Sequence, residues 1–252
     1  MMAKGKRVIA NSRYTASVIE ARDARAKDRI RVIYRGVDRN VFDPAAVDAQ
    51  AVDTLRAAWG VPPGTRIVLH AARLTSIKGQ RDLIAAAALA NAEGALHATR
   101  VVILAGDAPG AMPIARSCSA SSSVMASATE CGSSDIAGRC LRLILQRRSR
   151  SPHRRCRRAF GRTSAEAQAM GCPVIVPDLG ALPETILAPG QSQTGFTGWL
   201  FPPRDIASLA SRIGRALDLR RCGAGGNRLS SAGACGGELH ACADARGDAC
   251  RL

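Results

Sequence analysis

The stretch from Phe160 to Ile186, FGRTSAEAQAMGCPVIVPDLGALPETI, constrains the fold of this chain more than any other segment. Good helix formers run from Arg162 to Met170, with Ser164 placed to cap that helix and Glu166 in its first turn. Gly171 ends the helix, because glycine takes the left-handed backbone conformation without steric cost. The segment therefore predicts a helix with a sharp end.

A strand and a second short helix are expected directly after it. The apolar run from Cys172 to Val176 predicts a buried strand, and Pro183 suits the first position of the next helix. Glu184 follows, either to contact a ligand or to cap its own helix. Loop, helix, strand, loop and helix in this order are typical of an open parallel α/β sheet. The start of the first helix combines free N–H groups with the positive end of a helix dipole, which predicts an anion site.

The rest of the patterned sequence fits the same alternation. Apolar runs and turn residues predict further strands at residues 6–10, 30–34, 67–70, 100–105 and 198–203. Capping residues and apolar periodicity predict helices that begin at Asn11 or Ser12 and extend to about Lys27, and at 47–59, 82–90 and from Asp205 to Leu217. With 46% hydrophobic but only 3% aromatic residues, the core is expected to consist of Ala, Val, Leu and Ile.

Two cations, Arg73 and Lys78, lie on the loop between a predicted strand and a predicted helix. Such a bare pair usually consists of two solvated cations. Its place after a strand, before a helix and upstream of the anion site favours a diphosphate-binding loop instead.

The composition changes abruptly in two segments, 111–158 and 220–252. The first is rich in Ser and Arg, and between Arg116 and Arg158 ten arginines against two acidic residues supply +8 of the net charge of +16. A G/C-rich gene that is translated in the wrong reading frame yields such a mixture of Arg, Ser, Gly and Cys. We hypothesise that both segments are frame-shifted, which translation of the other frames of the sequenced gene would test.

The nine cysteines do not indicate a metal site. Eight of them lie in the two aberrant segments, no pair has C-x-x-C spacing, and only Cys172 falls in well-patterned sequence. The N-terminus lacks an apolar segment of signal-peptide length, and no run reaches the length of a membrane span. We therefore expect a cytoplasmic protein without a bound metal and without disulfides.

An alternative function follows from the charge. The run QRRSRSPHRRCRR resembles an arginine-rich arm that binds nucleic acid or another polyanion through phosphates. No aromatic residue lies within it to stack on bases, so a solvated run without specific nucleic-acid binding is the favoured interpretation.

The motif FGRTSAEAQAMGCPVIVPDLGALPE resembles the signature of the nucleotide-sugar glycosyltransferases of the GT-B fold, glycosyltransferase family 4 or group 1. Three further stretches resemble the same family: VIANSRYT, ARLTSIKG and TGWLFPPRD. The resemblance implies an α/β fold, a Rossmann-like parallel sheet that forms the donor-binding half of a GT-B enzyme, with an irregular middle and a disordered tail. The implied domains are a remnant of an N-terminal domain at 1–29, the Rossmann-like domain at 30–219 and the tail at 220–252.

The resemblance also implies a reaction and a site. The reaction is transfer of a sugar from a nucleotide-diphosphate sugar, with retention, to an acceptor glycan or lipid-linked sugar in cell-envelope polysaccharide or lipopolysaccharide synthesis. No separate cofactor is implied, and peripheral membrane association would suit such an acceptor. The implied catalytic residues are Arg73 and Lys78 at the diphosphate, and the implied donor-binding residues are Gly106, Gly161, Arg162, Thr163 and Glu166, the last at the ribose.

Two departures bear on activity. The family motif has a second glutamate eight positions before Glu166, where this chain has Arg158, and a cation offers no acceptor to sugar hydroxyls. The acceptor-binding domain is also missing from the residues matched. We expect the chain on its own to be a truncated fragment with weak or no transferase activity.

Overall fold

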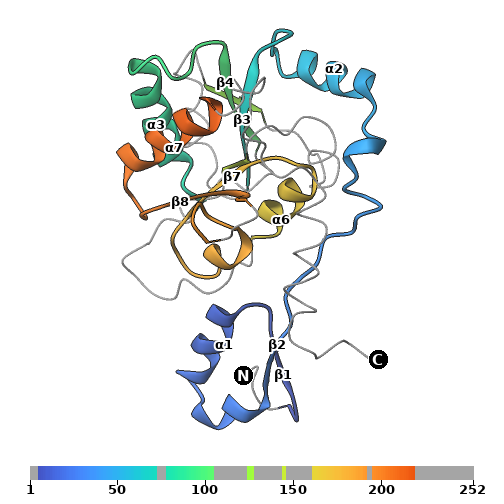
Figure 1. The fold of residues 1–252 in the computed structure, drawn as a ribbon, viewed down its shortest axis with the longest axis vertical. Helices are drawn as coiled ribbons and strands as arrows, with labels where there is room; N and C mark the ends of the chain where they lie inside the picture. Colours follow the sequence, from blue (N-terminus) through green and yellow to red (C-terminus); the bar gives the residue numbers. More distant parts are fainter. Residues whose placement is uncertain are drawn as a thin grey trace.

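The computed structural model describes residues 5–72, 78–104, 124–127, 144–145, 161–191 and 195–218. Figure 1 shows a small N-terminal unit of α1, β1 and β2 beside a larger lobe built around a sheet, joined by an extended linker. The predicted disordered tail, 220–252, lies outside the described residues.

The N-terminal unit is a two-stranded parallel sheet with helices. Strand β1 (Val8–Ala10) pairs with β2 (Ile30–Val32), and α1 (Arg13–Glu20) and the 3-10 helix η1 (Ala24–Arg29) connect them. Ser12 is the N-cap of α1, where its hydroxyl accepts from the Thr15 N–H at 3.0 Å. Residues 30–32 pair with this unit, although the predicted boundary at residue 30 assigned them to the second domain.

The linker carries two short helices whose starts are set by aspartates. The 3-10 helix η2 (Pro44–Ala46) is capped by Asp43, and α2 (Ala49–Ala58) by Asp48, whose carboxylate accepts from the Gln50 and Ala51 N–H groups. The second helix begins two residues later than predicted because the Asp48 side chain takes the capping position.

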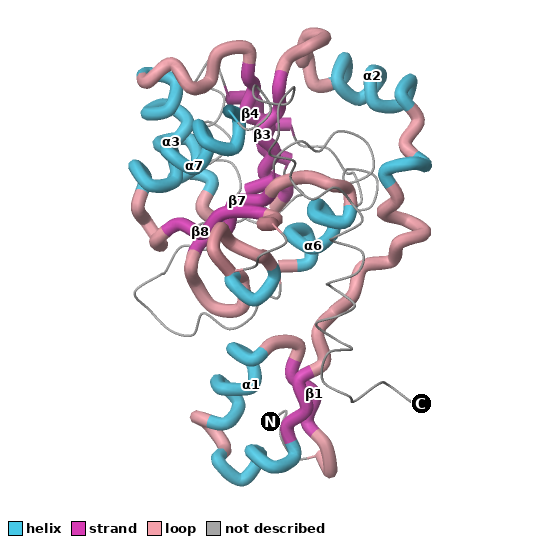
Figure 2. Tube along the Cα trace, in the orientation of Figure 1, coloured by secondary structure: helices cyan, strands magenta, loops and turns pink. Residues whose placement is uncertain are grey.

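The lobe contains a six-stranded sheet in which every pairing is parallel, as predicted for the fold class. Figure 2 shows its strands in magenta, with helices in cyan around them. The strand order is β5-β4-β3-β6-β7-β8. The strands are β3 (Arg66–Ala71), β4 (Thr99–Leu104), β5 (Val124–Ser127), β6 (Ile144–Leu145), β7 (Val174–Pro177) and β8 (Gly198–Phe201). The last of these is an edge strand, as its sequence predicted.

Two strands lie in the segment whose sequence shows no strand period. Strand β5 comes from the serine-rich text and pairs with β4, while β6 comes from the brief apolar run before the arginines and pairs with β3 and β7. The sequence showed no strand period at β5, so the prediction of an irregular middle was wrong there, whereas β6 lies in an apolar run, residues 141–145, that the sequence does show. Pairing with an existing strand satisfies backbone groups whatever the side chains, so a local pattern is not required.

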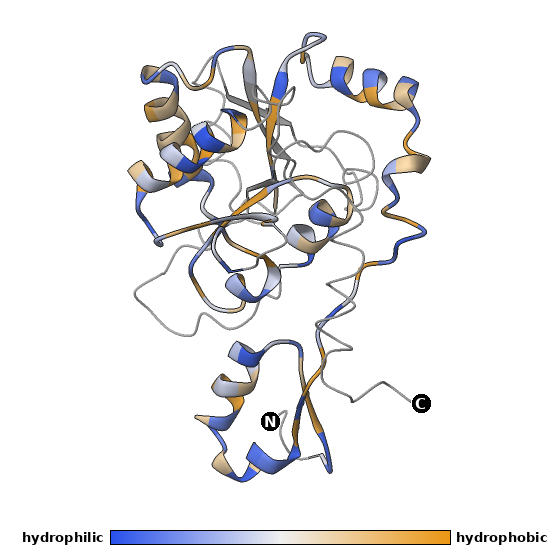
Figure 3. Cartoon of the chain, in the orientation of Figure 1, coloured by the Kyte–Doolittle hydropathy of each residue, from blue (hydrophilic) through white to orange (hydrophobic). Residues whose placement is uncertain are grey.

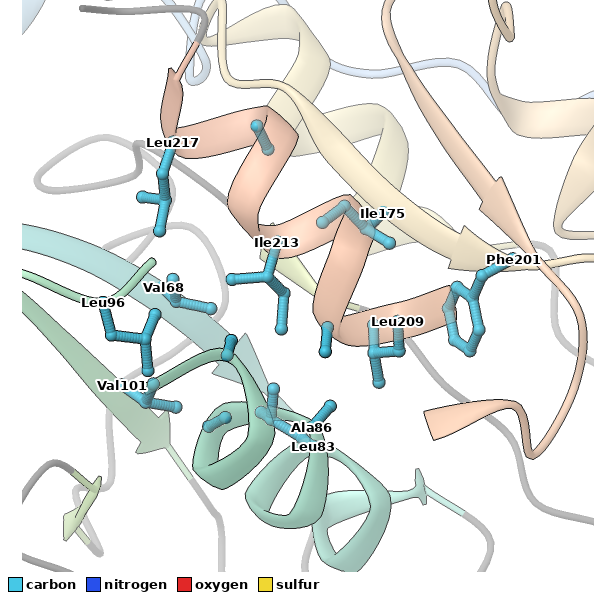
Figure 4. Packing of buried hydrophobic residues seen from close by; sticks show 14 of the residues in the cluster. Val68, Leu83, Ala86, Leu96, Val101, Ile175, Phe201, Leu209, Ile213 and Leu217 are labelled. Carbon is cyan, nitrogen blue, oxygen red and sulfur yellow. The ribbon is translucent and has the colours of Figure 1, made fainter. Parts of the chain in front are cut away.

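Helices cover both faces of the sheet. They are α3 (Gln80–Ala92), α6 (Arg162–Ala169), the 3-10 helix η4 (Pro183–Thr185) and α7 (Ile206–Asp218). One hydrophobic cluster joins α3 and α7 to the sheet; Figure 4 shows Leu83 and Ala86 on the side of α3 that faces Leu209 and Ile213, with Val68 near Leu96 and Val101. Asp205 starts α7, since its carboxylate accepts from the Ser208 N–H at 2.8 Å.

A second cluster lies on the opposite face and includes Trp59 after α2, Ala167 on α6 and Val176 on β7. Apart from two tryptophans and two phenylalanines, the two clusters are made of aliphatic residues and one cysteine, as the composition predicted. Figure 3 shows hydrophobic and hydrophilic residues recurring along the helices, which is the pattern of half-buried elements. Within the described part of the chain, no helix is long and apolar enough to cross a membrane.

Candidate functional site

The sheet changes its direction of winding between β3 and β6. From β3 the chain proceeds outward through β4 to β5, then returns to the other side of β3 at β6 and proceeds through β7 to β8. In open parallel α/β sheets, ligands bind outside the carboxyl ends of the strands at such a switch point. The loops that follow β3 and β6 are therefore the natural place for a site.

The segment after β3 ends at Lys78 and Gly79. Lys78 is half-buried, and Gly79 has φ 75° and ψ 24°, a left-handed conformation that turns the chain into α3. The loop residues 73–77 lie outside the described residues, and Arg73 with them. Of the two predicted diphosphate cations, the structure therefore describes Lys78, at the carboxyl end of β3.

His70 lies near the end of β3 and was not singled out by its sequence. Its side chain is 1% exposed, and its Nε2 lies 3.1 Å from the Lys78 carbonyl oxygen. Burial lowers the pKa of His70 to about 4, and the charge of Lys78 acts in the same direction, against the opposing effect of the carbonyl. The imidazole is therefore neutral near pH 7.

Helix α6 is the next element that the structure describes after β6. Gly161 is its N-cap and makes no side-chain capping hydrogen bond, so the first turn at Arg162 and Thr163 presents its dipole end without a local carboxylate. The predicted cap, Ser164, was wrong: this residue lies within the helix and is fully buried. Gly171 ends the helix at φ 69°, as predicted.

A buried hydrogen-bond network accounts for the position of Ser164 inside α6. Gln168 Nε2 donates to the Ser164 carbonyl at 2.9 Å and to the Thr185 carbonyl at 2.7 Å. The Thr185 hydroxyl donates to the Leu182 carbonyl at 2.7 Å and lies 3.2 Å from the Ser164 hydroxyl. These bonds lock α6 to the η4 segment and so fix the direction of its first turn.

Glu166 is the unusual residue of α6. It is 6% exposed, its Oε1 lies 3.5 Å from Arg162 Nε, and its Oε2 is buried without a hydrogen-bond partner among the described residues. A buried carboxylate oxygen left unpaired is costly, so such a group calls for a donor that is supplied from elsewhere. A ligand hydroxyl is a donor of that kind.

Glu184 acts between the two parts of the molecule. Its Oε2 accepts from the Arg13 N–H at 2.8 Å and from the Tyr34 hydroxyl at 3.0 Å, and its Oε1 accepts from the Tyr14 N–H at 2.8 Å. The Tyr14 ring also lies next to Gly180. Glu184 thus caps α1 of the N-terminal unit rather than its own helix, a contact that no local sequence signal could reveal.

The structure describes five residues of the predicted site. Lys78 follows β3, and Gly161, Arg162, Thr163 and Glu166 begin the helix that follows β6, the strand paired with β3. Gly106, Arg158 and the arginine-rich run lie outside the described residues. Within the described residues, no group of three His, Cys, Asp or Glu side chains could hold a metal ion.

A parallel sheet that winds in both directions from a switch point, with helices on both faces, defines a Rossmann-like α/β domain. The chain belongs to the family described as glycosyl transferases group 1, whose model matches residues 65–218. That range spans all six strands of the sheet and the helices that cover it.

The relatives with similar sequences are named as glycosyltransferases. A D-inositol 3-phosphate glycosyltransferase of Mycolicibacterium smegmatis (strain ATCC 700084 / mc(2)155) is 29% identical over 224 residues, which cover 84% of this chain and 45% of that protein. Its counterpart in Xylanimonas cellulosilytica is 31% identical over 170 residues, which cover 64% of this chain and 37% of that protein. The chain therefore spans less than half the length of these relatives.

Solved structures share the fold. A glycosyltransferase from Rickettsia africae ESF-5 has a TM-score of 0.71 at 23% identity. The match covers 87% of this chain and 55% of the Rickettsia protein. A UDP-forming alpha,alpha-trehalose-phosphate synthase from Burkholderia xenovorans has a TM-score of 0.57 at 13% identity. The match covers 76% of this chain and 44% of that protein. At these identities the likeness concerns the fold alone.

Proposed function

We propose that this chain is the donor-binding half of a glycosyltransferase that takes a sugar from a nucleotide-diphosphate sugar. The observation that carries the proposal is the buried Glu166 carboxylate, one turn into the helix α6, with one oxygen that has no hydrogen-bond partner among the described residues. A vicinal diol offers two donors to one carboxylate, so the ribose of a nucleotide is the ligand that suits Glu166.

The diphosphate would lie between the loop after β3 and the start of α6. Negative charge grows on the diphosphate as the bond to the sugar breaks. Fixed cations and helix N–H groups aimed at that charge lower the barrier without reorganisation, and one such group is typically worth about 3–4 kcal/mol. Lys78 and Arg73 would supply the cations, and residues 161–163 the N–H groups. Gly106 is proposed to lie near the base and ribose on the strength of the family resemblance.

Retention at the anomeric carbon is part of the proposal and rests on the same resemblance. For the acceptor, two classes are proposed: a cell-envelope glycan or lipid-linked sugar, and an inositol phosphate, the compound after which these relatives are named. Arg158 stands where the family has a glutamate for the donor sugar, so sugar transfer by this chain alone is expected to be weak.

The first test is nucleoside diphosphate binding by calorimetry, with uridine and guanosine diphosphates. Lys78→Ala should weaken binding strongly, because it removes a cation from the diphosphate. Arg81→Ala removes the same charge from an exposed position on α3 and should leave binding unchanged. Equal affinities for both variants, or salt-sensitive binding to any DNA duplex in place of nucleotide binding, would refute the proposal.

A second test addresses Glu166 directly. A 2′,3′-dideoxynucleoside diphosphate lacks the diol and should bind the unmodified chain about tenfold to a hundredfold more weakly than the ribonucleotide. In Glu166→Ala the two ligands should bind alike, since the carboxylate that discriminates between them is gone. Discrimination that survives in Glu166→Ala would assign the ribose to another residue.

A further inference from the structure

His70 is a buried polar side chain that the proposed chemistry does not use. It lies in β3, between the fully buried Leu69 and the half-buried Ala71, at a position where an apolar side chain would fill the core without desolvating a polar ring. Its Nδ1 is buried without a hydrogen-bond partner among the described residues. The hydrogen bond at Nε2 is thus what the imidazole adds at this position.

The partner of that bond fixes the tautomer. The Lys78 carbonyl oxygen only accepts, so His70 Nε2 carries the hydrogen and donates over 3.1 Å. A neutral imidazole has a single N–H, which leaves Nδ1 as a bare lone pair. The ring is therefore committed to one role, which is to hold the Lys78 backbone.

The bond closes the loop that follows β3. It connects residues eight positions apart, from the strand to the last loop residue before Gly79. Gly79 then turns in the left-handed conformation, and α3 begins at Gln80, which is buried. The Lys78 backbone is thus held by the His70 bond on one side and by the start of α3 on the other.

We propose that His70 is a positioning residue for the donor diphosphate: its Nε2–H holds the Lys78 carbonyl and thereby sets where the Lys78 ammonium can reach. The inference rests on the proposed function, because it assigns Lys78 to the phosphates. Lysine has a long flexible side chain, so the place of its backbone decides which phosphate oxygen it meets.

Substitution at His70 tests the role through a matched pair. His70→Leu removes the donor and should weaken nucleoside diphosphate binding about tenfold, the effect of one hydrogen bond, while leaving nucleoside binding unchanged. His70→Gln places an amide N–H near the position of Nε2 and should restore most of the affinity. Loss of nucleoside and nucleoside diphosphate binding in equal measure would overturn the inference.

A double-mutant cycle separates positioning from packing. If His70 acts through Lys78, then His70→Leu should cause no further loss of diphosphate affinity in the Lys78→Ala background. Additive losses would mean that His70 affects binding through general packing and would overturn the inference. Should the leucine variant fail to fold, His70→Asn takes its place, since its shorter amide does not reach the Lys78 carbonyl.

A nitrogen-15 NMR spectrum of the imidazole gives a readout without ligand. It should show a pyrrole-like Nε2 and a pyridine-like Nδ1 at pH 7; the reverse pattern would overturn the inference. If this pattern is present but the unmodified chain binds no nucleoside diphosphate, the proposed function fails. If the chain binds and His70→Leu binds equally well, the inference alone fails.

Discussion

The N-terminal unit and the six-stranded lobe show two ways of holding secondary structure in place. The lobe has helices on both faces of its sheet and two clusters of buried side chains. The N-terminal unit has two short strands, a few small buried side chains (Val8, Ala10 and Ala26) and a helix, α1, without a buried residue. It is tied to the lobe by the three hydrogen bonds of Glu184. Apolar burial therefore stabilises the lobe, whereas polar contacts position the unit.

The largest difference is expected from matched truncations of isoleucine. Ile213→Ala removes a fully buried side chain between α3 and α7 and should lower the free energy of unfolding by about 2–5 kcal/mol. Ile9→Ala removes a side chain that is 68% exposed in β1 and should change it by less than about 0.5 kcal/mol. Urea unfolding followed by circular dichroism measures both, and similar losses would contradict the contrast between the two parts.

Two glycines of the lobe sharpen the comparison further. A Cβ at Gly198, on β8, would overlap the Val174 carbonyl and lie 2.8 Å from Val174 Cγ2 on the adjacent strand. Gly198→Ala should therefore destabilise the lobe by about 1–3 kcal/mol. A Cβ at Gly214, within α7, would lie 3.5 Å from Ala95 Cβ, which is ordinary contact, so Gly214→Ala should stabilise by about 0.5–1 kcal/mol. Thermal unfolding would reveal the opposite signs, and equal shifts would contradict the strand packing.

A pH dependence of the lobe should follow from His70. Burial holds its folded pKa near 4, below the ordinary 6.5, so the unfolded chain takes up a proton first as the pH falls. Stability is fully present above pH 6.5, declines as the pH falls and is lost by about 4, with about 2 kcal/mol lost between pH 7 and 5. His70→Gln should lack this component in urea unfolding at the two pH values. An unchanged difference would assign the titration to other groups.

The most local effect concerns the contact between the parts. Glu184→Ala removes the acceptor for two backbone N–H groups at the start of α1, a loss of about 0.5–2 kcal/mol that should fall on the N-terminal unit. Amide hydrogen exchange of residues 13–20 should accelerate while β3 and β7 stay protected. Glu93→Ala, at an exposed carboxylate, serves as the control. Faster exchange throughout the lobe would mean that Glu184 also stabilises the sheet.

The sequence predicted those elements whose cause is local. Apolar runs placed β3, β4 and β7, and the spacing of Leu209 and Ile213 placed the buried face of α7. Gly171 ended α6 where its left-handed conformation was expected. In each case the determining residues lie within the element or next to it, so a short window contains the information.

The features that sequence reasoning missed depend on distant partners. Ser164 matches a capping residue locally, but its hydroxyl lies against Thr185, 21 positions away. Glu184 binds Arg13 across 171 positions, and β5 is a strand because β4 lies beside it. For the candidate site, the roles of Lys78 and of the start of α6 stay predictions. The hydrogen bond between His70 and the Lys78 carbonyl was not predicted, because no local pattern distinguishes a core histidine from one that holds a loop.

The unpaired strand edges of the N-terminal unit should affect the solubility of the purified protein. Within the described part of the chain, β1 and β2 pair only with each other, and Ile9 and Ile33 are exposed on or next to them. Unpaired strand edges with apolar side chains recruit other chains, whereas the net charge of +16 keeps molecules apart. Added salt screens that charge, so a purified sample should keep its clarity longest in dilute buffer and turn turbid as ionic strength rises.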